Sequence, residues 1–174
     1  MVDGLGKNNM KKSNLIKFNF PHKLYILMRN DIQSMNPGKA MAQAAHASNE
    51  FVGNYGDLDT VRNNWMGSNP HIEAKRHFGT TIVLAVNYEQ LISVLELAFT
   101  KKVPCGQVWD ETYPFQTTHE IASLIPHDRQ SAPAIYKDNG QVTMFRNELT
   151  CGYVFVVDGS SNQEELVGHL PLHP

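Results

Sequence analysis

Residues 24–47 read LYILMRNDIQSMNPGKAMAQAAHA. The five apolar residues at the start of this stretch are typical of a buried strand. A turn follows in which Asn36 is a good helix N-cap, and Pro37 suits the first helical position, where its missing N–H costs nothing. The small residues after Gly38 predict a helix that ends near Gly53. Because ligands of open α/β sheets usually bind where a strand leads into a helix, the stretch predicts both a fold class and a site.

The remainder of the chain alternates between apolar strands and amphipathic helices. Four strands are predicted, at residues 23–29, 80–86, 105–109 and 153–157, and a second helix at residues 88–101. This order is typical of a small α/β layered domain, and we expect residues 21–174 to form one such domain.

Residues 111–150 are less regular than the remainder of this domain. The sequence Asp-Asn-Gly at 138–140 separates two strand-like segments, 134–137 and 141–145, and therefore predicts a β-hairpin. We interpret residues 111–150 as an insertion at one end of the sheet that is long enough to act as a lid.

Composition narrows the class of protein. The chain has 174 residues, of which 41% are hydrophobic and 18% are charged, as in ordinary globular domains. No apolar run approaches the roughly 18 residues that span a bilayer, so we expect no membrane association. Cys105 and Cys151 fall on different predicted strands, and we expect two buried thiols in a reducing compartment, with a disulfide as the alternative.

Charge is distributed unevenly along the chain. The formal net charge is −2, but residues 1–23 carry five lysines and one aspartate. We expect residues 1–20 to form a flexible basic N-terminal arm, which either contacts phosphate groups or is a solvated tail.

Lys39 is the first candidate site residue. A cation is mildly disfavoured in the first turn of a helix, so a lysine there suggests an anion at the same place, either a phosphate or a developing oxyanion. Gln43 follows one turn later on the same helix face, and His46 lies three residues further on. The alternatives are a surface lysine whose stem packs on the strand and a histidine that hydrogen-bonds within the fold.

Asp110 is the second candidate, because it ends the strand predicted at 105–109. A carboxylate at this edge of a sheet is well placed to meet a lysine at the start of the neighbouring helix, and the pair could orient a water molecule or hold a substrate amine. Thr112 and Thr117 offer hydroxyl groups to the same rim. The alternative is an aspartate that only initiates a turn.

Several common motifs are absent from the sequence. It contains neither the GxGxxG nor the GxxxxGK[ST] phosphate-binding pattern, and no GxSxG nucleophile turn. Its eight histidines show no metal-ligand spacing. Nucleotide cofactors, a serine hydrolase of that type and a metal site are therefore not indicated.

The pattern between residues 29 and 47 is R-x-D-I-x-x-M-x-x-G-K-x-x-A-Q-x-x-H-A. It resembles the signature of the archaeal and eukaryotic peptidyl-tRNA hydrolases, the Pth2 family, in which a strand is followed by R-x-D-L and then by M-x-x-G-K-x-A-A-Q-x-x-H-A. Two further anchors agree in order. The strand that ends in Asp110 is similar to the family's strand ending in D-A-G-R-T, and ELVGHLPL at 165–172 is similar to the family's closing V-T-G-H-L-K-L.

This resemblance implies a mixed four-stranded sheet with helices on both faces. It also implies a cytoplasmic enzyme of translation that binds peptidyl-tRNA and hydrolyses the ester between peptide and tRNA, with neither metal nor organic cofactor. Lys39 and Asp110 match the family's site lysine and aspartate. The expected catalytic residues are Lys39, Asp110, Gln43 and His46, and the expected substrate-binding residues are Arg29, Asp31, Gly38, Thr112 and Thr117.

The sequence departs from the family after Asp110, where the family has A-G-R-T-Q and this chain has E-T-Y-P-F. Thr112 or Thr117 is a candidate to replace the family's hydroxyl group. Two alternative functions therefore stay open: a non-catalytic module that binds RNA or protein, and a hydrolase of the same fold with a different substrate. The sequence also leaves a homodimer open.

Overall fold

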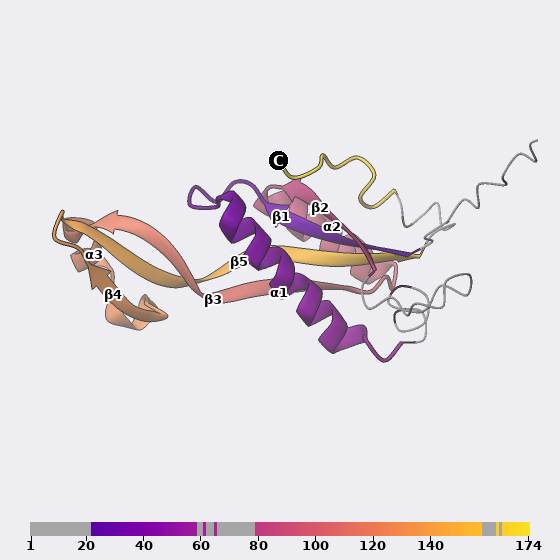
Figure 1. The fold of residues 1–174 in the computed structure, drawn as a ribbon, viewed down its shortest axis with the longest axis horizontal. Coiled ribbons are helices and arrows are strands. Elements are labelled where there is room, and N and C mark those ends of the chain that lie inside the picture. Colours follow the sequence, from indigo (N-terminus) through magenta and orange to yellow (C-terminus); the bar gives the residue numbers. More distant parts are fainter. Residues whose placement is uncertain (1–21, 59–60, 62–64, 66–78, 158–162, 164) are drawn as a thin grey trace, which may run out of the picture.

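A computed structural model describes residues 22–58, 61, 65, 79–157, 163 and 165–174 (Figure 1). The basic arm predicted for residues 1–20 lies outside these residues. The elements, in chain order, are β1 (His22–Arg29), α1 (Pro37–Tyr55), β2 (Thr80–Val86), α2 (Tyr88–Thr100), β3 (Cys105–Thr118), α3 (His119–Leu124), a 3₁₀ turn (His127–Arg129), β4 (Ala132–Tyr136) and β5 (Gln141–Val157).

The strands form one mixed sheet in the order β2-β1-β5-β3, and β4 joins it along β5. β1 is parallel to β2, whereas β5 runs antiparallel to β1, β3 and β4. The predicted α/β class and mixed sheet are confirmed, with β4 as a fifth strand. The segment after β5 returns to the outer edge of β2, where Leu172 bridges Leu84.

Two hydrophobic cores lie on opposite faces of this sheet, because successive strand residues point to opposite faces. On one face, Leu24, Ile26 and Met28 of β1 pack with residues of α1. On the other face, Leu27 packs with residues of α2. Helices therefore cover both faces, as the resemblance implied, and the carboxyl end of β1 emerges between the two cores.

Helix α1 begins as predicted but ends later. Asn36 is its N-cap and accepts a hydrogen bond from the backbone N–H of Lys39, and Pro37 occupies the first turn. The predicted end near Gly53 is wrong, since the helix continues to Tyr55. The Tyr55 ring contacts the rings of Phe51 and Tyr153 in the core between α1 and the sheet. This packing outweighs the roughly 1 kcal/mol that Gly53 costs inside the helix.

Strands β3 and β5 are much longer than predicted. The sequence indicated strands at 105–109 and 153–157 and a separate strand-like segment at 141–145, but β3 continues to Thr118 and β5 runs without a break from Gln141 to Val157. Beyond the body, the two strands continue as a pair and, with α3 and β4, form a projection that we call the β arm (residues 111–150; Figure 1). The sequence did not reveal this length because residues 111–118 and 146–152, which carry the two strands through the junction, are mostly polar.

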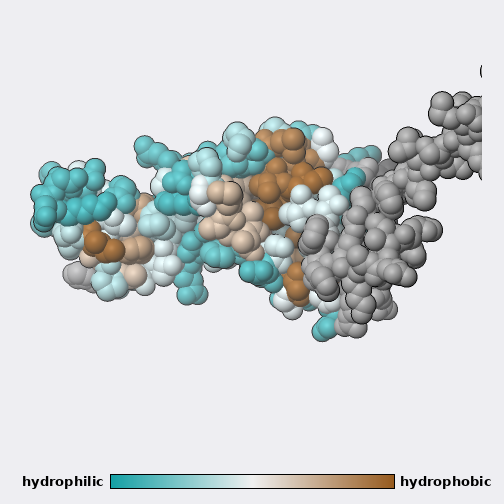
Figure 2. All heavy atoms as spheres, viewed as in Figure 1, coloured by the Kyte–Doolittle hydropathy of each residue, from teal (hydrophilic) through white to brown (hydrophobic). Residues whose placement is uncertain are grey.

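The β arm has a small core of its own. Ala122 of α3 packs there against Val142 and Met144 of β5. The hairpin predicted around 138–140 is confirmed, as β4 and β5 pair antiparallel and Gly140 has the positive φ of 79° that favours glycine. Figure 2 shows a mostly hydrophilic surface on the visible face of the β arm, with one small hydrophobic patch.

Both cysteines are free thiols, so the alternative of a disulfide is wrong, but the expectation of two buried thiols holds only for Cys151, because Cys105 is half-buried. Cys151 is fully buried, and burial raises the pKa of its thiol to about 12, which keeps it protonated at neutral pH. Among the helices described, none combines the length and the apolar character needed to cross a membrane.

Candidate functional site

The candidate site lies where β3 and β5 leave the body of the protein to form the β arm. The first turn of α1 and the carboxyl end of β1 reach the same place, because β1 is the direct neighbour of β5 and leads into α1. The predicted residues Arg29, Lys39, Gln43 and Asp110 therefore come from three elements that meet at one junction.

Two irregularities in the pairing of β3 with β5 bracket Asp110. The register shifts between Val108 and Trp109, where Thr150 is the extra residue on β5, and shifts again between Asp110 and Tyr113. Bulges of this kind turn side chains away from the regular alternation of a strand and are frequent beside active sites. Here they bring Asp110 and Thr150 to the side of the sheet that α1 covers, where both contact Gln43.

The carboxylate of Asp110 is held by three hydrogen bonds. Gln43 Nε2 donates to Oδ2 at 2.7 Å, and the backbone N–H and hydroxyl of Thr112 approach Oδ1 at 3.0 and 3.4 Å. A carboxylate offers about four acceptor positions, so roughly one is left for a water molecule or a substrate N–H. None of these partners is charged, and within the described chain Asp110 forms no ion pair.

Gln43 is the residue that fixes this carboxylate in place. It is only 3% exposed, and its Oε1 accepts a hydrogen bond of 2.7 Å from the hydroxyl of Thr150. Because Asp110 accepts hydrogen bonds and cannot donate them when ionised, the amide nitrogen of Gln43 must face Asp110 and its oxygen must face Thr150. Gln43 is thus suited to position Asp110.

Lys39 lies one turn before Gln43, but the β arm holds its ammonium group. Nζ donates to the carbonyl oxygen of Pro114 at 3.0 Å and lies 4.7 Å from the ring centroid of Tyr113, a cation–π contact. No described carboxylate contacts this ammonium group. Lys39 and Asp110 were expected to meet directly, but in this structure Gln43 is the residue of α1 that reaches Asp110.

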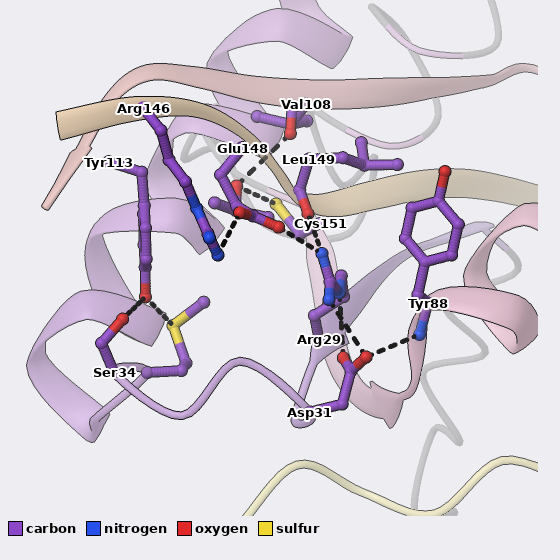
Figure 3. Close-up of polar contacts among 12 residues, drawn as sticks. Arg29, Asp31, Ser34, Tyr88, Val108, Tyr113, Arg146, Glu148, Leu149 and Cys151 are labelled. Atoms are coloured by element: carbon purple, nitrogen blue, oxygen red, sulfur yellow. Dashed lines mark hydrogen bonds and ion pairs between the residues drawn. The ribbon is translucent and has the colours of Figure 1, made fainter. Parts of the chain in front are cut away.

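Tyr113, whose ring contacts the ammonium group of Lys39, is only 1% exposed. Its hydroxyl accepts a hydrogen bond of 3.1 Å from Ser34 and lies 4.0 Å from the sulfur of Met35, both in the loop before α1 (Figure 3). Burial raises the pKa of Tyr113, so the phenol stays neutral near pH 7. Tyr113 therefore connects the β arm to the loop before α1, and its ring also contacts Lys39.

Arg29 ends β1 and is buried in a polar network (Figure 3). Its guanidinium donates to both oxygens of Asp31, at 2.9 and 3.0 Å, and through Nη1 to Glu148 at 2.6 Å and to the carbonyl of Leu149 at 2.9 Å. Burial alone would lower the pKa of this guanidinium, but the hydrogen bonds and charges of the two carboxylates raise it. Protein groups thus occupy the donors that were expected to bind substrate.

Asp31 provides a test of this network by pH. Its hydrogen bond with Arg29 lowers the pKa of Asp31 below the ordinary value of 3.8, so the pair stabilises the fold above that value. This stabilisation is lost as pH falls through the lowered pKa of the folded state. We expect Asp31→Asn to be less stable than the wild type at pH 7, with a difference that shrinks below about pH 4. Urea unfolding between neutral and acidic pH measures this difference, and an equal difference at every pH would contradict the assignment.

Three other predicted residues take no part in these contacts. His46 is exposed on α1, without a contact to Gln43 or Asp110 in the described structure. Thr117 lies on the β arm opposite Val142, seven residues beyond Asp110 along β3. Gly38 is exposed in the first turn of α1, where an added Cβ would meet only Asn36 Oδ1, at an ordinary 3.4 Å.

Sequence reasoning missed five residues that complete the site: Tyr113, Pro114, Arg146, Glu148 and Thr150. The first two were passed over because β3 was expected to end at 109. Arg146 and Glu148 have a spacing of two, which on a strand places both side chains on one face, and this signal becomes readable once β5 is known to begin at Gln141. Thr150 gave no signal, because its position depends on a bulge.

The described residues include no group of three or more His, Cys, Asp or Glu side chains arranged to hold a metal ion. Besides amides and hydroxyls, the charged groups described at this junction are the Lys39 ammonium, the guanidinium groups of Arg29 and Arg146, and the carboxylates of Asp31, Asp110 and Glu148.

Comparison with known proteins assigns the chain to a family. No curated protein matches the chain. Among solved structures, a protein of unknown function from Agrobacterium tumefaciens strain C58 is similar, at 10% identity and a TM-score of 0.46 over 90% of this chain and 100% of the other, which is too distant to carry an argument. The family model for peptidyl-tRNA hydrolase PTH2 matches residues 22–138, from β1 into the β arm. The chain belongs to the PTH2 family of peptidyl-tRNA hydrolases.

Proposed function

We propose that this protein hydrolyses the ester bond of peptidyl-tRNA, releasing the peptide and free tRNA during translation in the cytoplasm. One observation carries the proposal beyond family membership. Lys39 and Asp110 lie at one junction, with charges that are hydrogen-bonded but not neutralised by any described side chain of opposite sign. A cation and a carboxylate at one junction, neither of them paired with an opposite charge in the described structure, suit a reaction in which a water molecule is oriented and negative charge develops.

The chemical step uses one water molecule. Asp110 accepts a hydrogen bond from the water and takes its proton as the oxygen attacks the ester carbonyl, and the carbonyl π electrons move onto its oxygen. The ammonium of Lys39 stabilises that oxyanion. The tetrahedral intermediate then collapses, the bond to the ribose oxygen breaks, and Asp110 returns the proton to this oxygen. The peptide leaves with a new carboxyl group and the tRNA with a free hydroxyl group.

The neighbouring residues would prepare this step. Gln43 and Thr112 hold the carboxylate in one orientation, so little reorganisation is needed when the water is activated. Gly38 leaves the first turn of α1 open, so that substrate can approach Lys39. An ester needs no covalent enzyme intermediate, since a well-oriented water molecule is sufficient.

Release of a labelled peptide from an N-blocked aminoacyl-tRNA tests the proposal. We expect the wild type to turn over and Lys39→Ala to lower kcat about 100-fold, as does loss of a single oxyanion donor in other enzymes. Lys137→Ala is the matched control, because Lys137 is exposed on the β arm and outside the site. Its activity should equal that of the wild type.

Full activity of Lys39→Ala would overturn the role given to this lysine. A wild type that binds tRNA without releasing peptide would instead favour the non-catalytic RNA-binding module. The replaced sequence after Asp110 is the observation that keeps this second function in view.

A further inference from the structure

We infer that Arg146 forms, together with Lys39, a binding site for a phosphodiester group of an RNA strand at the base of the β arm. The choice of RNA as the ligand rests on the proposed function, whereas the arrangement of the two cations does not. Arg146 lies outside every motif of the sequence and is supplied by β5, the strand that runs through both body and arm.

The first support is position. Arg146 is the direct partner of Tyr113 in the pairing of β5 with β3, so the two side chains project from the same face of the sheet. Figure 3 shows them side by side, both extending from the strands toward the loop before α1. Because the ammonium of Lys39 rests on the same Tyr113 ring, one tyrosine has a cation over its ring and a second cation beside it.

The second support is the way in which Arg146 is held. Its Nη2 pairs with Glu148 Oε2 at 2.6 Å, and its Cζ lies 5.1 Å from the centroid of the Phe115 ring. A planar guanidinium fixed at one edge and on one face has lost most of its conformational freedom before any ligand arrives. The group is therefore preorganised.

The third support is that Arg146 remains available. Its side chain is 49% exposed, whereas that of Glu148 is only 13% exposed. Glu148 also pairs with Arg29, so one carboxylate is shared between two guanidinium groups. A guanidinium has five N–H donors, and the described structure pairs Arg146 with no acceptor besides Glu148. Several donors thus face solvent on the residue that pairs with Tyr113, whose ring Lys39 contacts.

The chemistry of the substrate indicates which anion fits. A guanidinium fork matches the oxygens of a phosphate in a bidentate manner, and an ammonium adds a compact second charge. In peptidyl-tRNA, the terminal ribose that bears the ester is joined to the chain by a phosphodiester. An N-blocked peptide carries no obligatory negative charge. The anion that is always near the scissile bond is therefore on the RNA side.

Binding of a labelled single-stranded RNA ending in CCA tests this inference without requiring turnover. The variants are Arg146→Ala, Arg146→Lys and, as a matched control, Arg129→Ala, since Arg129 is an exposed arginine on the 3₁₀ turn of the β arm. Between about 50 and about 200 mM salt, we expect Arg146→Ala to weaken binding roughly 10-fold and to reduce the salt slope by about one phosphate contact. Arg146→Lys should keep the slope and recover part of the affinity, and Arg129→Ala should match the wild type.

A kinetic comparison separates the contribution of Arg146 from that of the catalytic groups. For peptidyl-tRNA, Arg146→Ala should raise KM about 10-fold with little change in kcat, because the contact exists in both ground and transition states. For an N-blocked aminoacyl-adenosine, which has no phosphodiester, the same variant should behave like the wild type. Thermal unfolding of each variant shows whether the fold is retained, and Arg146→Lys provides the result if Arg146→Ala does not fold.

The inference is overturned if RNA binding and its salt slope are unchanged in Arg146→Ala, if Arg129→Ala loses as much, or if the wild type does not bind the RNA. A wild type that binds RNA through Arg146 but releases no peptide would refute the proposed hydrolysis and leave this inference standing.

Discussion

Replacing Asp110 with asparagine is expected to lower kcat for peptide release by roughly 100- to 10,000-fold, the usual contribution of a positioned acid or base. Asparagine has nearly the same shape but cannot accept the proton of the attacking water. It also brings an N–H₂ group into a position where the three present partners, Gln43 Nε2 and the backbone and hydroxyl of Thr112, act as donors. Single-turnover release of labelled peptide measures the chemical step, and KM should change little.

Glu111→Gln is the matched control for this experiment. Glu111 is the adjacent carboxylate in the sequence, is exposed, and its side chain forms no hydrogen bond or ion pair in the described structure. It should retain wild-type kcat. If Asp110→Asn keeps its thermal midpoint and also its rate, then Asp110 is only a turn residue and the proposed water activation is wrong.

The second large effect concerns stability. Arg29→Ala should lower the free energy of unfolding by about 3 kcal/mol, because it leaves Asp31, Glu148 and the carbonyl of Leu149 without their shared donor. Glu148 keeps Arg146 as a partner, which limits the loss. Urea unfolding at pH 7 measures the change. Arg29→Lys should recover only a small part of it, since an ammonium cannot reproduce a fork with three acceptors.

Arg129→Ala again provides the comparison, because its exposed side chain should contribute less than about 0.5 kcal/mol. Equal stability of Arg29→Ala and the wild type would show that Arg29 is free to contact substrate, as the family pattern suggested. A large loss of stability would instead show that the R-x-D pattern has a structural role. Arg29 would then hold the end of β1 in place and would not bind the ligand.

The body of the fold could be predicted from the sequence because its signals are local. Asn36 and Pro37 specify the start of α1, and β2 is a continuous run of apolar and β-branched residues whose predicted ends are correct. The later end of α1 could not be predicted, since the packing of Tyr55 on residues far away in the sequence decides it. Lys39 and Asp110 were predicted as site residues from their places at the ends of predicted elements; Lys39 does lie in the first turn of α1, but Asp110 lies within β3, between its two register shifts.

What the sequence did not reveal depends on pairing over long distances. In the β arm, the strand-like segments predicted at 134–137 and 141–145 overlap β4 and β5, but the continuations of β3 through 111–118 and of β5 through 146–152 were missed, because these residues are mostly polar. The contacts of Lys39 with Pro114 and of Gln43 with Thr150 join residues 75 and 107 positions apart. Both depend on the register of β3 on β5, including bulges that leave no trace in composition or periodicity.

The acceptor that holds Lys39 is a main-chain oxygen, and this has a consequence for how the protein can vary. Any amino acid at position 114 supplies the same carbonyl, so substitutions there can accumulate without releasing the lysine. Proline is tolerated because β3 is an edge strand. A single-residue insertion or deletion between Asp110 and Pro114 would instead slide a different carbonyl, or none, under the ammonium group. Between Asp110 and Pro114, the identity of the residue at position 114 can therefore vary, whereas the length of the segment cannot.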